Sequence, residues 1–124
     1  VDSLYKIKPP FNVSRPALFA ATAAIKDTAW LNKEIRHVRK WSKIFYDTFK
    51  KLNIHTNRTS VNFLLINFDR VKKNSKEVFS VLAKAGILLR KMDVYSIKNS
   101  LRVTVGNSKE NLKLIIELKK IFNV

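Results

Sequence analysis

The spacing of the apolar residues changes near Ser60, and this change most limits the folds open to the chain. Upstream, from Asp27 or Thr28 onward, apolar side chains recur at steps of three, four or seven and predict one long helix: Leu31, Ile35, Val38, Phe45, Phe49 and Leu52. Downstream, residues 61–68 form a short, nearly continuous apolar run of β-forming residues, which predicts a buried central strand. The chain therefore joins a long helix to a β segment.

Capping signals predict two helices after this strand. Asn74 and Glu77 have the spacing of a capping box, in which each side chain bonds the other residue's backbone N–H. Gly86 then stands where a helix C-terminus favours a positive φ. The capping-box spacing recurs at Asn107 and Glu110, before a final helix.

Two further apolar runs, residues 87–90 and 101–105, are predicted strands joined by a polar loop. With the strand at 61–68 they give the order strand, helix, strand, strand, helix. Such a unit folds as a small three-stranded sheet with helices packed on one face. The predicted fold class is therefore α/β, a two-layer sandwich preceded by a long helix.

The N-terminal residues 1–16 hold all three prolines, Pro9, Pro10 and Pro16. Proline fixes φ and pushes its predecessor into extended geometry, so we expect a non-helical arm there. Pro16 also suits the first position of a helix, and the alanine-rich residues 17–25 predict one.

A net charge of +16 raises the question of nucleic-acid binding. The basic residues are mostly lysines, 18 of 25, scattered over the chain without a helix-turn-helix or RNP-like signature. A free-standing basic α/β module that binds nucleic acid through counterion release is therefore kept only as the alternative function.

The composition also bears on the compartment. No apolar run approaches the roughly 20 residues that span a bilayer, and the N-terminus lacks the layout of a secretory signal. Cysteine is absent, which fits a reducing compartment. We expect a soluble, cytoplasmic protein with no membrane partner.

The residue types predict no catalytic and no metal-binding residue in this chain. His37 and His55, the two histidines, belong to no motif that would make them bases or ligands, so we interpret both as surface or packing residues. No metal-ligand spacing is present, and two glycines are too few for a phosphate-binding loop.

Arg90 and Arg102 stand at or inside predicted strands, where a solvated charge would not be expected. If these strands are neighbours, the two guanidinium groups converge and form a clamp for a carboxylate or phosphate, because each planar fork makes two parallel hydrogen bonds. Free amides at the helix start after Gly106 would favour the same anion. The alternative is that the arginines pair with Asp93 or Glu110.

Five short segments, in this order along the chain, match one protein family. They are residues 8–17 (KPPFNVSRPA), 60–63 (SVNF), 86–90 (GILLR), 101–106 (LRVTVG), and then Glu110 with Asn111. Together they resemble the interdomain segment, the small-domain strands and the last helix of histidinol-phosphate aminotransferases, which are pyridoxal-phosphate-dependent enzymes of fold type I. The resemblance covers essentially the whole chain. It implies a C-terminal part of such an enzyme, divided into an interdomain arm (1–16), linking helices that include the long interdomain helix (17–52) and the small domain (53–124).

The resemblance implies roles for three residues. Arg102 matches the arginine that binds the amino-acid carboxylate in the wider superfamily, Arg90 matches a second one, and both are expected near the substrate phosphate in this branch. Asn62 matches a substrate-site position close to the domain interface. The resemblance further implies a phosphate-bearing amino substrate, 2-oxoglutarate as amino acceptor, a role in histidine biosynthesis, a large domain missing from this chain, and a homodimer. Threonine-phosphate decarboxylases and aromatic aminotransferases have similar small domains and stay open.

The chain departs from the family in lacking the motif of the catalytic lysine. In the family, the Schiff-base lysine lies in a Ser-Lys motif followed by Arg-x-Gly, upstream of the Pro-Phe-Asn segment. Ser-Lys occurs here at Lys43, Lys76 and Lys109, never followed by Arg-x-Gly, so we reject all three. We expect the complete enzyme to hold pyridoxal phosphate, and this chain alone to hold no cofactor and to be inactive.

Overall fold

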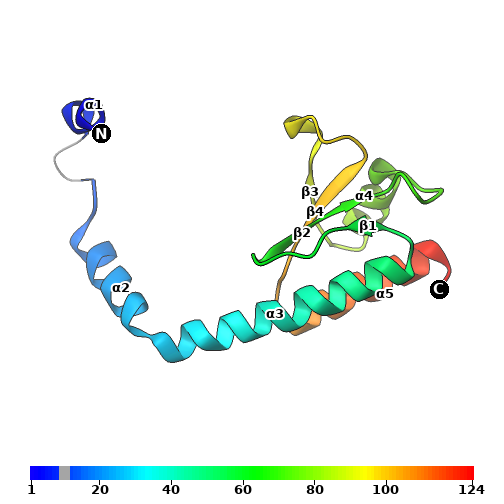
Figure 1. Ribbon diagram of the computed structural model, residues 1–124, viewed down its shortest axis with the longest axis horizontal. Coiled ribbons are helices and arrows are strands. Elements are labelled where there is room, and N and C mark those ends of the chain that lie inside the picture. Colours follow the sequence, from blue (N-terminus) through cyan, green and yellow to red (C-terminus); the bar gives the residue numbers. More distant parts are fainter. Residues whose placement is uncertain (9–11) are drawn as a thin grey trace. The chain divides into compact units, whose positions relative to one another are not determined.

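The structure is a computed structural model and describes residues 1–8 and 12–124. The chain divides into two compact units, residues 1–34 and residues 35–124, and each is described by itself. Figure 1 labels the helices and strands in chain order. Within the described part, no helix is both long enough and apolar enough to cross a membrane.

The first unit contains α1 (Asp2–Ile7), α2 (Arg15–Lys26) and the start of α3 (Thr28–Lys51). α2 is the first helix expected from the sequence. Its N-terminus is capped by Ser14, whose hydroxyl oxygen accepts a hydrogen bond from the Ala17 N–H at 3.3 Å, and a proline stands in its first turn.

The expectation of a non-helical arm over residues 1–16 is wrong where α1 forms. A proline restricts only its immediate predecessor, so a short helix can form before that position. Lys8, which caps α1 in an extended conformation (φ −67°, ψ 127°), is that predecessor. The geometry expected at Pro9 and Pro10, and the motif position Phe11, lie outside the described residues.

In the second unit, α3 directs a row of aromatic rings into the core. Trp41 is buried, and Phe45 and Phe49 are fully buried. The rings of Phe45 and Phe49 stack with their centroids 5.5 Å apart. The predicted apolar stripe is confirmed in this part of the helix, whereas Ile35 at the start of the unit stays 37% exposed.

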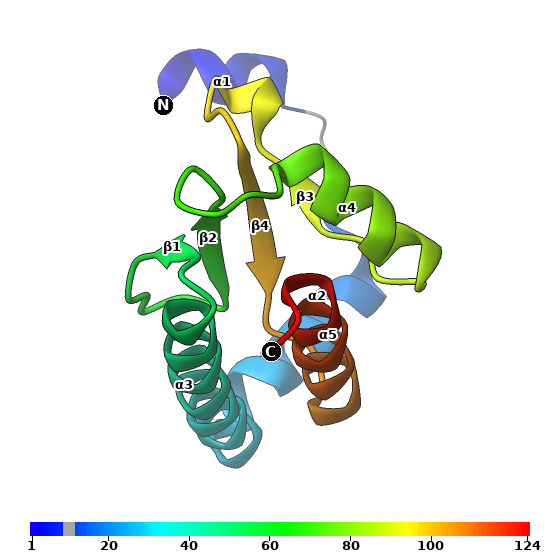
Figure 2. The same ribbon diagram turned by 90° about the vertical axis from the view of Figure 1, so that its right-hand side faces the viewer.

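The sheet has four strands in the order β1-β2-β4-β3, and every neighbouring pair is antiparallel. The strands are β1 (His55–Thr56), β2 (Phe63–Asn67), β3 (Arg90–Lys91) and β4 (Ser100–Thr104). Figure 2 shows β2 beside β4, the longest pairing, in which Leu65 lies opposite Arg102.

Two details of the sheet differ from the prediction. Three strands were expected, but β1 adds a fourth, a two-residue edge strand with no periodicity of its own. The strand expected at 87–90 is shorter and lies later. The Ile87 N–H closes the preceding helix by bonding the Leu82 carbonyl, and only Arg90 and Lys91 have partners in β4.

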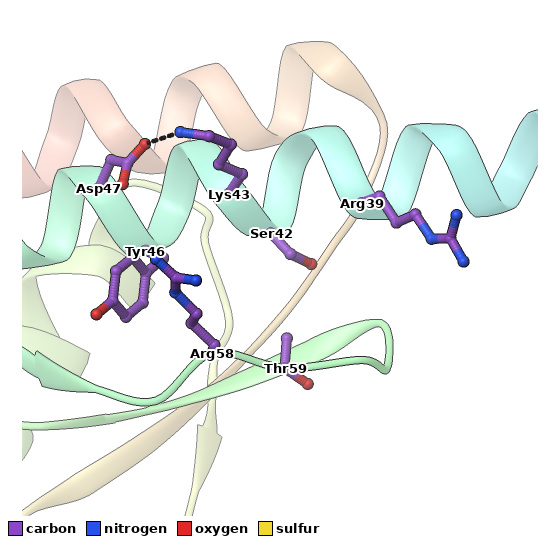
Figure 3. A pocket seen from close by; sticks show the side chains of 7 residues that line it. All are labelled: Arg39, Ser42, Lys43, Tyr46, Asp47, Arg58 and Thr59. Carbon is purple, nitrogen blue, oxygen red and sulfur yellow. Dashed lines mark hydrogen bonds and ion pairs between the residues drawn. The ribbon is translucent and has the colours of Figure 1, made fainter.

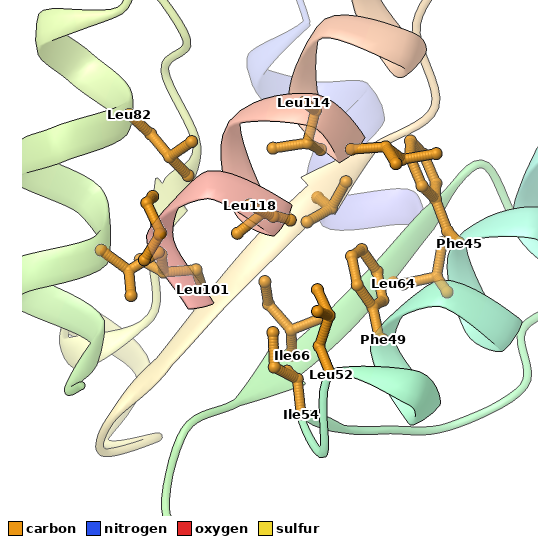
Figure 4. Packing of buried hydrophobic residues seen from close by; sticks show 14 of the residues in the cluster. Phe45, Phe49, Leu52, Ile54, Leu64, Ile66, Leu82, Leu101, Leu114 and Leu118 are labelled. Atoms are coloured by element: carbon orange, nitrogen blue, oxygen red, sulfur yellow. The ribbon is translucent and has the colours of Figure 1, made fainter. Parts of the chain in front are cut away.

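Helices α4 (Ser75–Lys84) and α5 (Ser108–Phe122) both start with a complete capping box, as the sequence predicted. Gly86 follows α4 with φ +75°, also as predicted. The buried residues of α3, α4 and α5 form one cluster with alternate residues of the central strands. Figure 4 shows Phe45 and Phe49 meeting side chains of α5 and of the central strands, among them Leu64 and Leu118.

This alternation determines which side chains lie on the face of the sheet away from the core. Side chains of successive strand residues point to opposite faces. Leu101 and Val103 are buried in the core, so Arg102 between them belongs to the other face, with Leu65 as its cross-strand neighbour. The fold therefore places a charged residue of the central pair on the face away from the core.

Candidate anion-binding site

The structure brings Arg90 and Arg102 together. They are direct cross-strand partners in the β3–β4 ladder, so their side chains share one face of the sheet. This confirms the expected juxtaposition, and it follows from a hairpin-like return of the chain between the two strands.

Aromatic rings hold both guanidinium groups. The Arg90 Nη2 donates a hydrogen bond to the Tyr95 hydroxyl, and its guanidinium carbon lies 5.4 Å from the centroid of that ring. The guanidinium carbon of Arg102 lies 4.9 Å from the ring centroid of Phe63. Such contacts orient a cation without neutralising its charge.

No carboxylate neutralises either arginine among the described residues. The ion pairs there join Lys43 to Asp47 and Lys120 to Glu117. Glu110, one of the acids considered as a partner, instead accepts the Asn107 N–H at 2.9 Å in the capping box of α5. The alternative of locally paired arginines is therefore wrong for Glu110, and residues 1–8 and 12–124 show no ion pair of either arginine with Asp93.

Arg102 also has an unused donor. Its Nε is buried and has no hydrogen-bond partner. A buried donor without a partner costs about 1–3 kcal/mol, so an acceptor that binds beside it would recover this cost. The arginine pair is therefore short of an acceptor.

A groove of about 410 Å³ opens at these arginines. Its walls come from the turn after α4, from β3 and β4, and from the first turns of α5; the polar residues among them include Arg90, Arg102, Thr104, Glu110 and Lys113. Lys113 adds a third cation that the sequence did not indicate, because a lysine on an exposed helix face has no distinguishing pattern. The Nζ of Lys113 lies 3.6 Å from the position that a Cβ atom on residue 86 would occupy.

Buried polar contacts fix the junction between β4 and α5 at one end of the groove. The Asn111 side chain accepts from the Gly106 N–H at 2.9 Å and donates to the Gly106 carbonyl at 2.8 Å. From α3, the His37 Nε2 lies 2.9 Å from the same carbonyl, and the Trp41 Nε1 donates to the Ser108 hydroxyl at 3.3 Å. His37, which was interpreted as a surface or packing residue, is part-buried and contacts the chain at Gly106.

Asn62 is not brought into the groove. It lies one residue before β2 and is exposed, and its backbone carbonyl accepts the Val105 N–H at 2.8 Å. Phe63 and Leu65 share the face of Arg102, so the alternation of the strand directs Asn62 to the opposite face. Its expected role at the site stays a prediction.

No group of three or more potential metal ligands occurs among the described residues. Of the three Ser-Lys lysines, Lys43 bonds Asp47 at 2.8 Å, and Lys76 and Lys109 lie in the first turns of α4 and α5. None of them lines the arginine groove.

Residues 1–118 match the family described as Aminotransferase class I and II. A match over this much of the sequence, together with a small α/β domain that presents paired arginines, places the chain in that family: it belongs to the class I and II aminotransferases.

Its relatives narrow the class to one branch. The chain is 42% identical to histidinol-phosphate aminotransferase of Pelagibacter ubique over 125 residues, which is 99% of this chain and 34% of that protein. The fold resembles the histidinol-phosphate aminotransferase of Clostridium acetobutylicum with a TM-score of 0.88 at 21% identity, over 98% of this chain and 37% of that one. The enzyme from Sinorhizobium meliloti, solved with pyridoxal-5'-phosphate, gives 0.83 at 17% identity, over 98% and 34%.

The chain thus spans about a third of the length of the curated relatives it matches. These relatives confirm the resemblance that the sequence motifs indicated.

Proposed function

We propose that this chain is the C-terminal small domain, a two-layer α/β unit with its linking helices, of a pyridoxal-phosphate-dependent histidinol-phosphate aminotransferase. In this proposal Arg90 and Arg102 bind the phosphate of the substrate. The observation that carries the proposal is the partly buried Arg102, whose Nε has no hydrogen-bond partner and whose cross-strand neighbour is a second arginine; neither arginine forms an ion pair with an acid among the described residues.

The charges around the groove support an anionic ligand. Arg90, Arg102 and Lys113 contribute three positive charges against the single negative charge of Glu110, whose carboxylate accepts a hydrogen bond from a backbone N–H. A phosphate at neutral pH carries close to two negative charges and three acceptor oxygens. The forked guanidinium groups match such oxygens in geometry as well as in charge.

Within the whole enzyme we propose a division of labour. Pyridoxal phosphate, when bound, supplies the electron sink for amino-group transfer. The small domain recognises and orients the anionic end of the substrate, so that the amino group is presented to chemistry performed elsewhere. The same proposal includes a large domain, a homodimeric assembly and a cytoplasmic location. It also includes 2-oxoglutarate as the amino acceptor and a place in histidine biosynthesis.

A binding comparison on the 124-residue chain tests the role of the arginines. We expect histidinol phosphate to bind and histidinol, which lacks the phosphate, to show no saturable binding by isothermal titration calorimetry. Arg102→Gln should weaken binding by roughly tenfold or more, since a hydrogen bond to a charged group contributes about 1.5–3 kcal/mol. Arg102→Lys should recover only part of the loss, because a lysine cannot form the two parallel bonds.

Arg36→Gln is the matched control, because Arg36 is an exposed arginine of α3 outside the groove. Equal weakening by Arg36→Gln and Arg102→Gln would mean that only net charge matters, and the proposed site would be wrong.

The absence of catalysis in this chain has its own test. After addition of pyridoxal phosphate and borohydride, mass spectrometry of a tryptic digest should find no lysine modified stoichiometrically. A single, fully modified lysine would overturn the assignment of the catalytic lysine to another part of the enzyme.

A further inference from the structure

A second pocket lies between α3 and the segment that follows β1. It has a volume of about 250 Å³ and shares no lining residue with the arginine groove. Arg39, Ser42 and Tyr46 line it from α3, and Arg58 and Thr59 close it from the other side (Figure 3). The α3 residues lie three or four positions apart, so they form one stripe along the helix.

The hydroxyl of Ser42 is the unusual group in this pocket. The residue is only 8% exposed, and its Oγ is buried without a hydrogen-bond partner. A serine within a helix usually bonds the carbonyl one turn earlier, but this hydroxyl makes no such bond. Ser42 therefore places an unused donor in the wall of a concave, basic pocket, where an acceptor would satisfy it once the side chain turns toward the pocket.

The charges of the pocket leave a positive excess. The carboxylate of Asp47 accepts a hydrogen bond from Lys43 at 2.8 Å, and this bond, together with smaller effects of Lys51 and Arg58, lowers the pKa of Asp47. The ion pair of Lys43 and Asp47 is neutral as a unit, and neither Arg39 nor Arg58 pairs with an acid among the described residues.

The guanidinium of Arg58 is also oriented. Its central carbon lies 5.4 Å from the ring centroid of Tyr46, and Figure 3 shows the two side chains stacked at one side of the pocket. Figure 3 shows the Ser42 hydroxyl between Arg58 on one side and Arg39, which extends away from Arg58, on the other. The volume of about 250 Å³ is large enough for a single phosphate group with a small substituent.

We propose that this pocket binds a small phosphate-bearing molecule, with the Ser42 side chain turning to donate its hydroxyl to one phosphate oxygen and with Arg39 and Arg58 balancing its two negative charges. The ring of Tyr46 contacts the non-phosphate part of the ligand. An extended polyanion is the less suitable ligand, because the buried hydroxyl can be reached only by a group that enters the pocket.

The test is a titration of the ¹⁵N-labelled 124-residue chain with inorganic phosphate at constant ionic strength. Backbone amide shifts at Ser42 and Thr59 report this pocket, and those at Thr104 and Lys113 report the arginine groove. We expect saturable shifts at Ser42 and Thr59. Arg102→Gln should leave them unchanged, so that failure of this proposal and failure of the proposed function give different results.

Ser42→Ala separates binding from folding. The variant should weaken phosphate binding at Thr59 by roughly tenfold or more. Its melting temperature should not fall, because it removes a buried hydroxyl that has no partner. Arg58→Gln should weaken binding similarly, whereas Lys40→Gln, which removes an exposed cation of α3 outside the pocket, should not.

Any one of three outcomes would overturn the proposal: phosphate does not shift Ser42 and Thr59, Ser42→Ala binds phosphate as well as the parent chain, or Lys40→Gln weakens binding as much as Arg58→Gln. If an unrelated single-stranded oligonucleotide shifts these amides while phosphate does not, the surface binds a polyanion and the proposed small-molecule site is wrong.

Discussion

Replacing Asn111 by alanine should destabilise the protein more than its position on an ordinary helix suggests. Asn111 is 2% exposed, and its side-chain amide makes two hydrogen bonds to the backbone of Gly106. It accepts from the Gly106 N–H and donates to the Gly106 carbonyl. The variant would lose both bonds. The Gly106 carbonyl would keep its contact with the His37 Nε2, but the Gly106 N–H would have no replacement partner.

The size of the effect can be estimated from these contacts. Each neutral hydrogen bond contributes about 1 kcal/mol net, and the N–H left partly buried adds a desolvation cost of about 1 kcal/mol or more. We therefore expect Asn111→Ala to lower the free energy of unfolding by about 3 kcal/mol. Asn107→Ala, which removes the N-cap of the same helix, should cost only about 1 kcal/mol.

Urea denaturation followed by far-ultraviolet circular dichroism at 25 °C measures both changes. The slope of unfolding free energy against urea should be the same in the parent and both variants, so that the midpoints report stability alone. If Asn111→Ala costs no more than Asn107→Ala, the two bonds to Gly106 do not hold the junction of β4 and α5, and the reasoning fails.

Three further predictions concern the core, pH and backbone. Phe49→Ala should cost about 3–5 kcal/mol in urea denaturation, because the ring is fully buried, and a loss below about 1 kcal/mol would contradict the core described here. Side-chain hydrogen bonds from Asn99 and Asn67 lower the pKa of Asp69 from 3.8. This carboxylate therefore stabilises the fold above about pH 4 and ceases to do so as the pH falls through its folded-state pKa, so urea midpoints of Asp69→Asn should depend less on pH between 6 and 3 than those of the parent. Gly86→Ala should cost about 1–2 kcal/mol by thermal denaturation, since φ is +75° while the added carbon has room, and Gly86→Asn should cost less; equal costs would argue against backbone strain.

Local signals explain what could be predicted from the sequence. The capping boxes at Asn74 and Asn107 involve residues three positions apart, so their pattern survives whatever the rest of the chain does. The meeting of Arg90 and Arg102 was also accessible, because two apolar runs joined by a short polar loop tend to pair. In each case the determining contacts lie close together along the chain.

Two kinds of feature could not be predicted: a strand too short to show a periodicity, and contacts between distant segments. β1 has only two residues and is held by its ladder to β2 and by the Thr56 hydroxyl, which donates to the Leu65 carbonyl at 2.8 Å. Lys113 enters the groove because the turn at Gly86 lies against α5. The free hydroxyl of Ser42 likewise depends on what packs around it, and no spacing in the sequence reveals an unmet hydrogen bond.

The contacts of His37 and Trp41 with the β4–α5 junction make the rotational setting of α3 a determinant of the groove. Both side chains must point at Gly106 and Ser108 while Phe45 and Phe49 point into the core. One inserted residue turns everything beyond it by about 100° around the helix axis. After a single insertion between Trp41 and Phe45, the helix could not keep both sets of contacts. It would lose either the contacts of His37 and Trp41 with the β4–α5 junction or the burial of Phe45 and Phe49 in the core. An insertion upstream of residue 35 would leave that segment intact and spare both.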